Sequence, residues 1–157
     1  MGTKHVFIIL IGTIFLLSAC GSNQQPTSNN QKDTSGTPAA NTPAPDKGVG
    51  KFTDVKLTHP LDETMVKKGE AIFNVKCMAC HKLTDEKLVG PGWKGITDRR
   101  TPEYIMNFVT NTDDMLNKDP NAKALLEVCM VRMPNQNLTD DEAREILEFI
   151  RRNDGKN

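Results

Sequence analysis

The stretch Cys77-Met78-Ala79-Cys80-His81 places two thiols and an imidazole at the spacing C-x-x-C-H. At this spacing two cysteines can add to the two vinyl groups of a single haem. Two intervening residues in a tight helical turn bring both sulfurs to one edge of the porphyrin, and the next residue points at its face. The sequence therefore predicts one covalent haem, with Cys77 and Cys80 as attachment residues and His81 as a ligand to the iron.

Paired cysteines have two other common uses. A redox dithiol of the thioredoxin kind requires a βαβ pattern around the motif, and no such pattern is visible here. A structural zinc site requires four Cys or His ligands. Beyond the motif and the first twenty residues, the chain offers only Cys129 and His59, with no second paired spacing. A disulfide or redox dithiol is therefore the main alternative to haem, and zinc is the weaker one.

Length and charge limit the remaining possibilities. The chain has 157 residues, with 20 basic and 20 acidic side chains, so its charge does not indicate nucleic-acid binding. Two unusual segments at the N-terminus leave roughly 100 residues for a folded domain, which is enough for one small core. Only 5% of the residues are aromatic, so a large apolar cofactor would help to fill that core.

The N-terminus has the pattern of an exported protein. A basic start is followed by an apolar run from Val6 to Leu17, as in a secretory signal peptide. The run is shorter than the roughly 20 residues of a transmembrane helix. Leu17-Ser18-Ala19-Cys20 resembles the lipobox of bacterial lipoproteins, which implies cleavage before Cys20 and attachment of lipid to it. Several acyl chains would anchor the protein durably. An uncleaved anchor helix and an ordinary signal peptide are the alternatives.

The segment from Gly21 to about Gly50 consists mostly of Asn, Gln, Ser, Thr, Pro, Ala and Gly. Such a composition cannot offset the entropy cost of ordering the chain, so we expect disorder. About thirty residues of flexible chain span on the order of 30 Å. The predicted organisation is a signal peptide at 1–19, a lipid-anchored disordered tether at 20–50 and a haem domain at 51–157.

Helical patterns dominate the predicted haem domain. An apolar stripe with helical spacing predicts a helix over about 62–77. A capping box at Thr139–Glu142 predicts the start of a C-terminal helix. Thr101-Pro102 and Asp119-Pro120 each combine an N-cap residue with proline at the first helical position. The expected fold class is all-α.

These motifs occur in an order that resembles the class I mono-haem c-type cytochromes, here in a bacterial lipoprotein form. The resemblance covers about 62–152. It implies a small cytochrome c fold, in which N- and C-terminal helices cross and helices and loops wrap around one haem. The crossing would be formed by Gly69 and Phe73 of the first helix and by Ile146 and Phe149 of the last.

The loop Val89-Gly90-Pro91-Gly92-Trp93 resembles the family loop next to the haem histidine. The resemblance implies that the Pro91 carbonyl accepts a hydrogen bond from the non-ligating nitrogen of His81. Such a bond fixes the ring and tunes its basicity. It also implies that Trp93 packs against the porphyrin, which makes Pro91 and Trp93 cofactor-binding residues.

The resemblance also identifies the second axial ligand. Met133-Pro134 lies six residues before Thr139, where the family places a methionine on a loop. Proline keeps that loop out of a helix. Met130 is the competing ligand, and an open or different sixth position is the third option. Cys129 is expected to be a buried small hydrophobe or a thiol that pairs between molecules.

Two filled axial positions leave no vacant site on iron, and His/Met ligation raises the potential. We therefore expect a one-electron carrier, not an enzyme, on the periplasmic or extracytoplasmic side of the cell envelope. Its partners would be a membrane-associated respiratory donor and a terminal oxidase or reductase. The runs 90–95 and 133–138 also resemble small lipoprotein cytochromes of Bacteroidetes-type respiratory gene clusters, some associated with nitrous-oxide reduction, so nitrous-oxide reductase is one candidate. A haem sensor or enzyme with a labile sixth ligand is the alternative.

Charge is uneven along the domain. Residues 51–100 carry ten basic and seven acidic side chains, and residues 101–157 carry seven and eleven. Four lysines lie near the haem motif: Lys76, Lys82, Lys87 and Lys94. They would steer the protein towards an acidic partner. Ordinary solvation of the surface explains the same counts.

Overall fold

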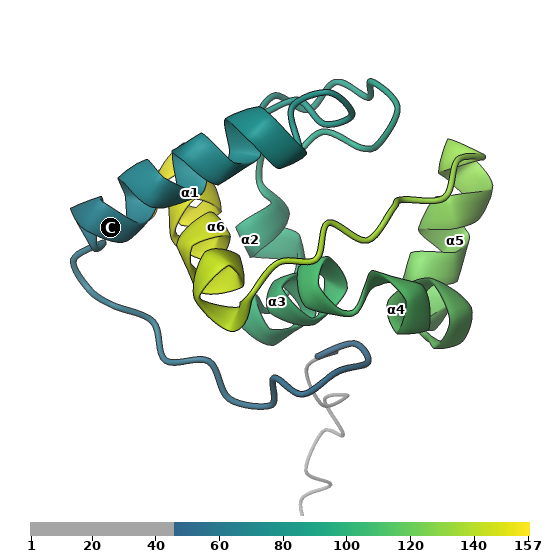
Figure 1. Ribbon diagram of the computed structural model, residues 1–157, viewed down its shortest axis with the longest axis horizontal. Coiled ribbons are helices and arrows are strands. Elements are labelled where there is room, and N and C mark those ends of the chain that lie inside the picture. The colour runs from purple at the N-terminus through teal and green to yellow at the C-terminus, as the bar shows by residue number, and fades with distance from the viewer. Residues whose placement is uncertain (1–45) are drawn as a thin grey trace, which may run out of the picture. The chain divides into compact units, whose positions relative to one another are not determined.

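The computed structural model describes residues 46–157, and this part of the chain is helical, with no strands (Figure 1). The helices are α1 (Glu63–Lys76), α2 (Ile96–Arg99), α3 (Pro102–Thr110), α4 (Thr112–Lys118), α5 (Pro120–Cys129) and α6 (Asp140–Asn153). The predicted all-α class is confirmed. None of these helices has the length and apolar character needed to cross a membrane. The predicted signal peptide, the lipid attachment at Cys20 and most of the tether lie outside the described residues.

Each of the four predicted helices begins close to its predicted start, directly after a capping residue. The side chains of Asp62, Thr101, Asp119 and Thr139 all accept hydrogen bonds from backbone N–H groups of the following turn. At the last of these caps, Glu142 completes the capping box by accepting a bond from the Thr139 N–H. These interactions involve residues two to three positions apart, which is why the sequence alone reveals them.

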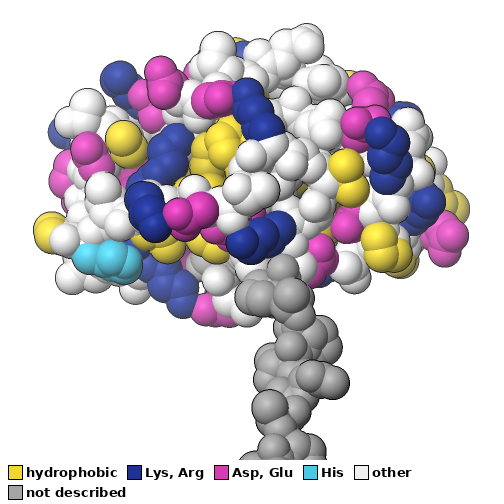
Figure 2. All heavy atoms as spheres, turned by 90° about the horizontal axis from the view of Figure 1, so that it is seen from below, with side chains coloured by type: hydrophobic (Ala, Val, Ile, Leu, Met, Phe, Trp, Pro, Cys, Tyr) yellow, Lys and Arg dark blue, Asp and Glu magenta, His cyan; other side chains and the backbone are white. Residues whose placement is uncertain are grey.

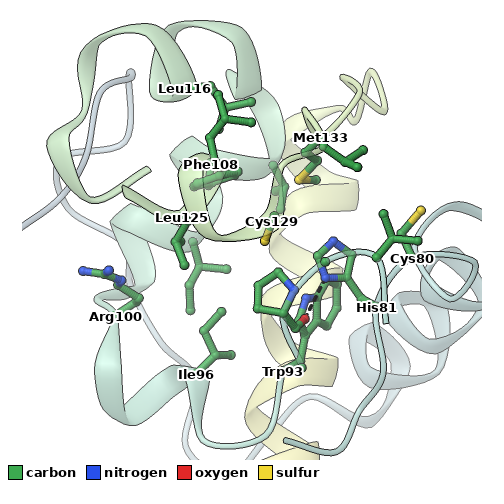
Figure 3. Close-up of a pocket in the computed structure, with 18 of the residues that line it drawn as sticks. Cys80, His81, Trp93, Ile96, Arg100, Phe108, Leu116, Leu125, Cys129 and Met133 are labelled. Carbon is green, nitrogen blue, oxygen red and sulfur yellow. Dashed lines mark hydrogen bonds between the residues drawn. The ribbon is translucent and has the colours of Figure 1, made fainter. Parts of the chain in front are cut away.

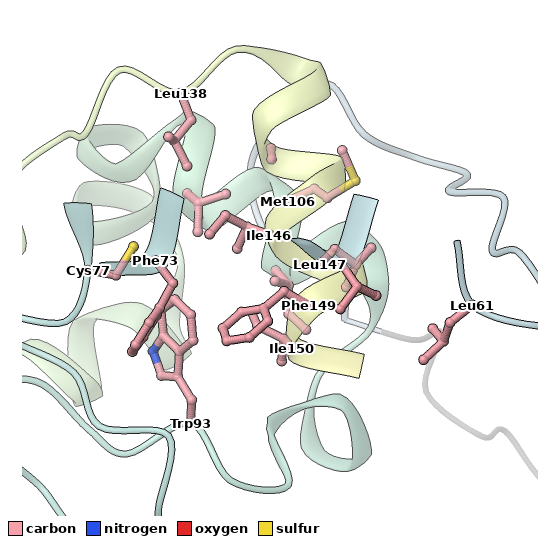
Figure 4. Close-up of a cluster of buried hydrophobic side chains, with 14 residues drawn as sticks. Leu61, Phe73, Cys77, Trp93, Met106, Leu138, Ile146, Leu147, Phe149 and Ile150 are labelled. Atoms are coloured by element: carbon pink, nitrogen blue, oxygen red, sulfur yellow. The ribbon is translucent and has the colours of Figure 1, made fainter. Parts of the chain in front are cut away.

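Helices α1 and α6 cross as predicted (Figures 1 and 4). A Cβ atom on Gly69 would lie 2.1 Å from the Glu145 carbonyl oxygen and 2.8 Å from Phe149 Cβ. Only glycine therefore allows the two backbones to come this close. Phe73 packs on Phe149 with ring centroids 5.5 Å apart, and Ile146 is fully buried. The glycine and the three apolar side chains thus form the centre of the main hydrophobic core.

Two short helices were not predicted. Helix α2 is four residues long and α4 is seven. Helices this short are not stable in isolation and form because tertiary contacts hold them. In α4 those contacts are made by Met115 and Leu116, which are buried in a second cluster with Tyr104 and Ala122.

The folded part starts earlier than the predicted boundary between the 20–50 tether and the 51–157 domain. Asn107 of α3 is almost completely buried, and its amide nitrogen donates to the carbonyls of Lys47 and Phe52, both at 2.9 Å. Its amide oxygen accepts from the Phe52 N–H at 2.9 Å. A Cβ on Gly50 would lie 2.2 Å from that oxygen. Polar groups of distant helices hold this segment, so its composition could not reveal that it is ordered.

A buried carboxylate links α6 to the segment before α1. Glu148 is completely buried and contacts Arg144 at 2.5 Å and Arg151 at 2.8 Å. It also accepts hydrogen bonds from the Thr58 hydroxyl at 2.7 Å and the Asp62 N–H at 3.1 Å. Burial alone would raise its pKa, but these donors lower the pKa of Glu148 to about 2. The carboxylate is therefore ionised in the folded protein.

This network predicts acid-sensitive stability. The ordinary pKa of Glu148 is 4.5, so its stabilisation is complete above that value and is lost as the pH falls towards about 2. Glu148→Gln is expected to destabilise the haem protein by about 3–5 kcal/mol at pH 7, because the buried Arg151 and the partly buried Arg144 lose their anionic partner. The penalty should shrink by about 2 kcal/mol at pH 3.

Urea unfolding at the two pH values measures both quantities. Glu127→Gln, the same change at an exposed helical position, is the control and should have little effect at either pH. An equal penalty for Glu148→Gln at pH 7 and pH 3 would contradict the prediction.

Candidate haem site

A mostly apolar cavity of about 450 Å³ lies between the motif region and helices α3 and α5 (Figure 3). Its aliphatic and aromatic wall includes Trp93, Ile96, Ile105, Phe108, Leu125 and Leu126. A cavity of this size and character suits one large, flat, apolar ligand.

The C-x-x-C-H motif forms a turn directly after α1. The N–H groups of Cys80 and His81 both donate to the Cys77 carbonyl, at 3.0 and 2.9 Å. The turn places Cys80 and His81 at the cavity. Cys77 instead lies in the adjacent hydrophobic core with Phe73 and Trp93 (Figure 4), and burial raises the pKa of its thiol to about 11. No disulfide joins the two cysteines.

His81 is about nine-tenths buried, and its Nδ1 donates to the Pro91 carbonyl at 2.9 Å. The predicted hydrogen bond is thus present. It holds the ring proton on Nδ1 and leaves the lone pair on Nε2. Burial lowers the pKa of His81, and the bond to Pro91 only partly opposes this effect. Because no group among residues 46–157 bonds to Nε2, the neutral imidazole is prepared to bind a metal ion.

The glycines of the Gly-Pro-Gly loop allow close approach. A Cβ on Gly90 would lie 2.3 Å from His81 Cε1, and a Cβ on Gly92 would lie 2.3 Å from the Thr84 carbonyl oxygen. The Gly90 N–H also donates to the Cys80 carbonyl at 2.9 Å. The loop is therefore held against the motif, and the glycines are needed for this close fit.

Trp93 connects the helix crossing to the histidine. Its ring centroid lies 5.0 Å from that of Phe73 and 5.3 Å from the His81 imidazole. It is buried and also lines the cavity. Trp93 therefore supports the orientation of His81, and its packing against a porphyrin stays a prediction.

The two candidate methionine ligands, Met130 and Met133, point in different directions after the end of α5. Helix α5 ends where Met130 adopts a left-handed φ of 58° and donates its N–H to the Leu126 carbonyl at 2.8 Å. The Met130 side chain is 84% exposed and does not reach the cavity, whereas Met133 lines it. Cys129 also lines the cavity, half-buried, which the sequence patterns did not predict.

A cationic edge completes the site. Arg99 and Arg100 both line the cavity. The Arg100 guanidinium lies 4.6 Å from the Tyr104 ring centroid and 3.6 Å from Asp46. These groups fit a haem, which has an apolar ring and two carboxylates. The apolar wall suits the ring, the Cys80 thiol and the His81 nitrogen suit its attachment and its iron, and the two guanidinium groups suit the carboxylates. The zinc alternative needs a cluster of ligands, and no group of three or more His, Cys, Asp or Glu side chains suited to a metal ion occurs within 46–157.

Comparison with known proteins gives consistent matches. The family profile described as cytochrome c matches residues 66–154. A curated relative, the cytochrome c-553-like protein of Synechocystis sp., is 29% identical over 63 residues, which cover 39% of this chain and 60% of the relative. The match thus spans less than two thirds of that relative.

Solved structures show the same similarity. A cytochrome c from Rhodothermus marinus is 36% identical, with a TM-score of 0.65, over 68% of this chain and 90% of that one. An engineered variant of it, bound to a carbene intermediate, is 34% identical, with a TM-score of 0.62, over 68% of this chain and 92% of that one.

Proposed function

Because the chain belongs to the cytochrome c family and carries one covalently attached haem c, we propose that it is a one-electron carrier with His81 and Met133 as the axial ligands. Cys77 and Cys80 would hold the porphyrin through thioether bonds. The observation that carries the proposal is that Met133 and His81, whose Nε2 has no hydrogen-bond partner among the described residues, line the same cavity. When bound, the haem supplies reversible one-electron chemistry at its iron.

The surrounding residues prepare the site for electron transfer. Pro91 fixes the orientation of the His81 ring before any metal binds, so the ligand does not have to reorganise. Trp93 and Phe108 supply apolar walls for the macrocycle. A thioether from Met133 would raise the potential and would close the sixth position to other ligands.

Met133→Ala tests the ligation directly. We expect the variant to lose the weak far-red absorption band of a methionine–iron bond and to have a lower redox potential, because the thioether stabilises reduced iron. Absorption spectra of the oxidised protein and a redox titration measure both effects. Met130 lies three residues earlier and its side chain is exposed, so Met130→Ala should change neither the far-red band nor the redox potential. A far-red band that survived in Met133→Ala would refute the ligand assignment.

A haem enzyme or sensor with a labile sixth ligand is the second candidate function. It is kept because the engineered Rhodothermus variant is bound to a carbene intermediate, which is a property of that protein. Carbon monoxide binding to the reduced wild-type protein at neutral pH separates the two functions. An electron carrier with both axial positions filled should not bind it.

We further infer that the protein is a lipoprotein on the extracytoplasmic side of a membrane, anchored through Cys20. The support is the signal-peptide pattern followed by the lipobox-like sequence. Its partners would be a respiratory donor and a terminal oxidase or reductase, with nitrous-oxide reductase one candidate. Mass analysis of the mature N-terminal peptide tests the anchor, because it should begin at a lipid-modified Cys20.

The lysines near the motif are not equivalent. Lys82 pairs with Glu86 at 2.5 Å, and Lys76 lies 3.4 Å from Glu142. Lys87 and Lys94 are exposed and form no ion pair with the described residues. On the face drawn in Figure 2, basic and acidic side chains are interspersed. Lys87 and Lys94 are therefore the charges best suited to steer an acidic partner.

A double variant, Lys87→Gln with Lys94→Gln, should slow oxidation of the reduced protein by the anion ferricyanide at low ionic strength. The effect should fade at high salt because mobile ions screen exposed charges. Stopped-flow kinetics over a salt series measure it. Lys67→Gln with Lys123→Gln removes the same charge from other exposed positions and should have a smaller effect. Equal rates for the two double variants would argue against steering.

A further inference from the structure

Cys129 occupies an unexpected position. It is the last residue of α5, and its side chain lines the same cavity as Met133 and His81. Figure 3 shows its sulfur directed into the cavity, on the side that also carries Met133, with the His81 ring facing both. The sulfur atoms of Cys129 and Met133, four residues apart in the chain, therefore both face the imidazole of His81.

The geometry of His81 gives a second indication that this space accommodates a metal ligand. His81 is about nine-tenths buried, its Nδ1 is bound to Pro91, and its Nε2 has no hydrogen-bond partner within 46–157. This nitrogen belongs to a residue that lines the cavity, so its lone pair is available to a ligand bound there. The wall that Nε2 faces is the wall on which the second axial ligand must lie, and Cys129 is part of that wall.

The two sulfurs are held differently. Cys129 belongs to a helix whose last turn is secured by the bond from the Met130 N–H to Leu126 and by Lys87 Nζ, which donates to the Val128 carbonyl at 3.0 Å. Met133 lies on a segment without helical hydrogen bonds. Displacing Met133 therefore requires less disruption than displacing Cys129, so the cysteine remains in the cavity when the methionine leaves.

We propose that Cys129 is a reserve axial ligand, which binds the haem iron through its sulfur when Met133 is absent or displaced. The inference rests on the proposed ligation by Met133. In the exchange the Met133 Sδ–iron bond breaks, the Cys129 sulfur–iron bond forms and the thiol proton passes to water, and no electron is transferred. Thiolate donates more electron density than thioether and favours oxidised iron. The exchange would lower the potential and keep the iron closed to small molecules.

The test compares three variants of the full chain matured with haem: Met133→Ala, Cys129→Ser and the double variant. In the oxidised state, absorption and electron paramagnetic resonance spectra report the ligands and spin state. We expect Met133→Ala to be low-spin with thiolate ligation and the double variant to be high-spin. Cys129→Ser alone should keep the far-red band and the wild-type potential.

Met133→Leu, which keeps the side-chain volume, replaces Met133→Ala if the smaller residue impairs folding. Alkylation by iodoacetamide, followed by peptide mass analysis, provides a second readout, since Cys129 should be protected only when Met133 is missing. A high-spin Met133→Ala protein, indistinguishable from the double variant, would overturn this inference alone. Survival of the far-red band in Met133→Ala would overturn the proposed Met133 ligation and this inference with it.

Discussion

Replacing Cys77 and Cys80 together with alanine is expected to leave the chain without covalent haem and largely unfolded. The two thiols are the only groups in the motif that can form thioether bonds to the vinyl groups. Loss of the macrocycle would empty a cavity of about 450 Å³. Its apolar walls would then be exposed to water, which costs free energy in proportion to the apolar area exposed. A typical domain has only about 5–15 kcal/mol of stability in total.

Mass analysis should show no added haem on this double variant, and far-UV circular dichroism should show little helix and no cooperative thermal transition. Cys129→Ser removes a thiol from the same cavity without touching the attachment motif and is the matched control. It should retain haem and a cooperative transition. A folded, haem-free double variant would show that the cavity does not need the cofactor for stability.

Gly69→Leu is expected to destabilise the haem protein by at least about 3 kcal/mol, the upper range for overpacking a core. A Cβ at this position meets the Glu145 carbonyl oxygen at 2.1 Å, and this oxygen is backbone that cannot move aside alone. The helices α1 and α6 would have to separate. That movement would disturb the contact between Phe73 and Phe149, and through Trp93 the support of His81.

Leucine has a higher helix propensity than glycine by nearly 1 kcal/mol, which acts in the opposite direction and makes any measured loss a lower limit for the steric effect. Urea unfolding of the holoprotein measures the change. Glu70→Leu, at the adjacent exposed position of α1, is the control and should have a small effect. A fully stable Gly69→Leu holoprotein would contradict the crossing.

Much of this protein could be predicted from local sequence patterns. The haem motif depends on a spacing of three residues, and the helix starts at Asp62, Thr101, Asp119 and Thr139 depend on caps that act within one turn. The helix crossing followed from the resemblance to a known family. The motif and the caps require no knowledge of how distant segments meet. The helix crossing comes from a pattern shared by a family.

The remaining features were decided by contacts between distant segments. A single left-handed residue, Met130, turns the chain so that Met133 faces the cavity and Met130 faces solvent. The same α5 helix brings Cys129 to the cavity, and Asn107 holds the segment from Lys47 to Phe52 on the domain. The sequence by itself determined which chemistry the chain carries, because attachment spacing and capping are local. Only the tertiary structure decided which sulfurs face His81, because a side chain's direction beyond a helix end depends on backbone angles and on packing between residues far apart in the chain.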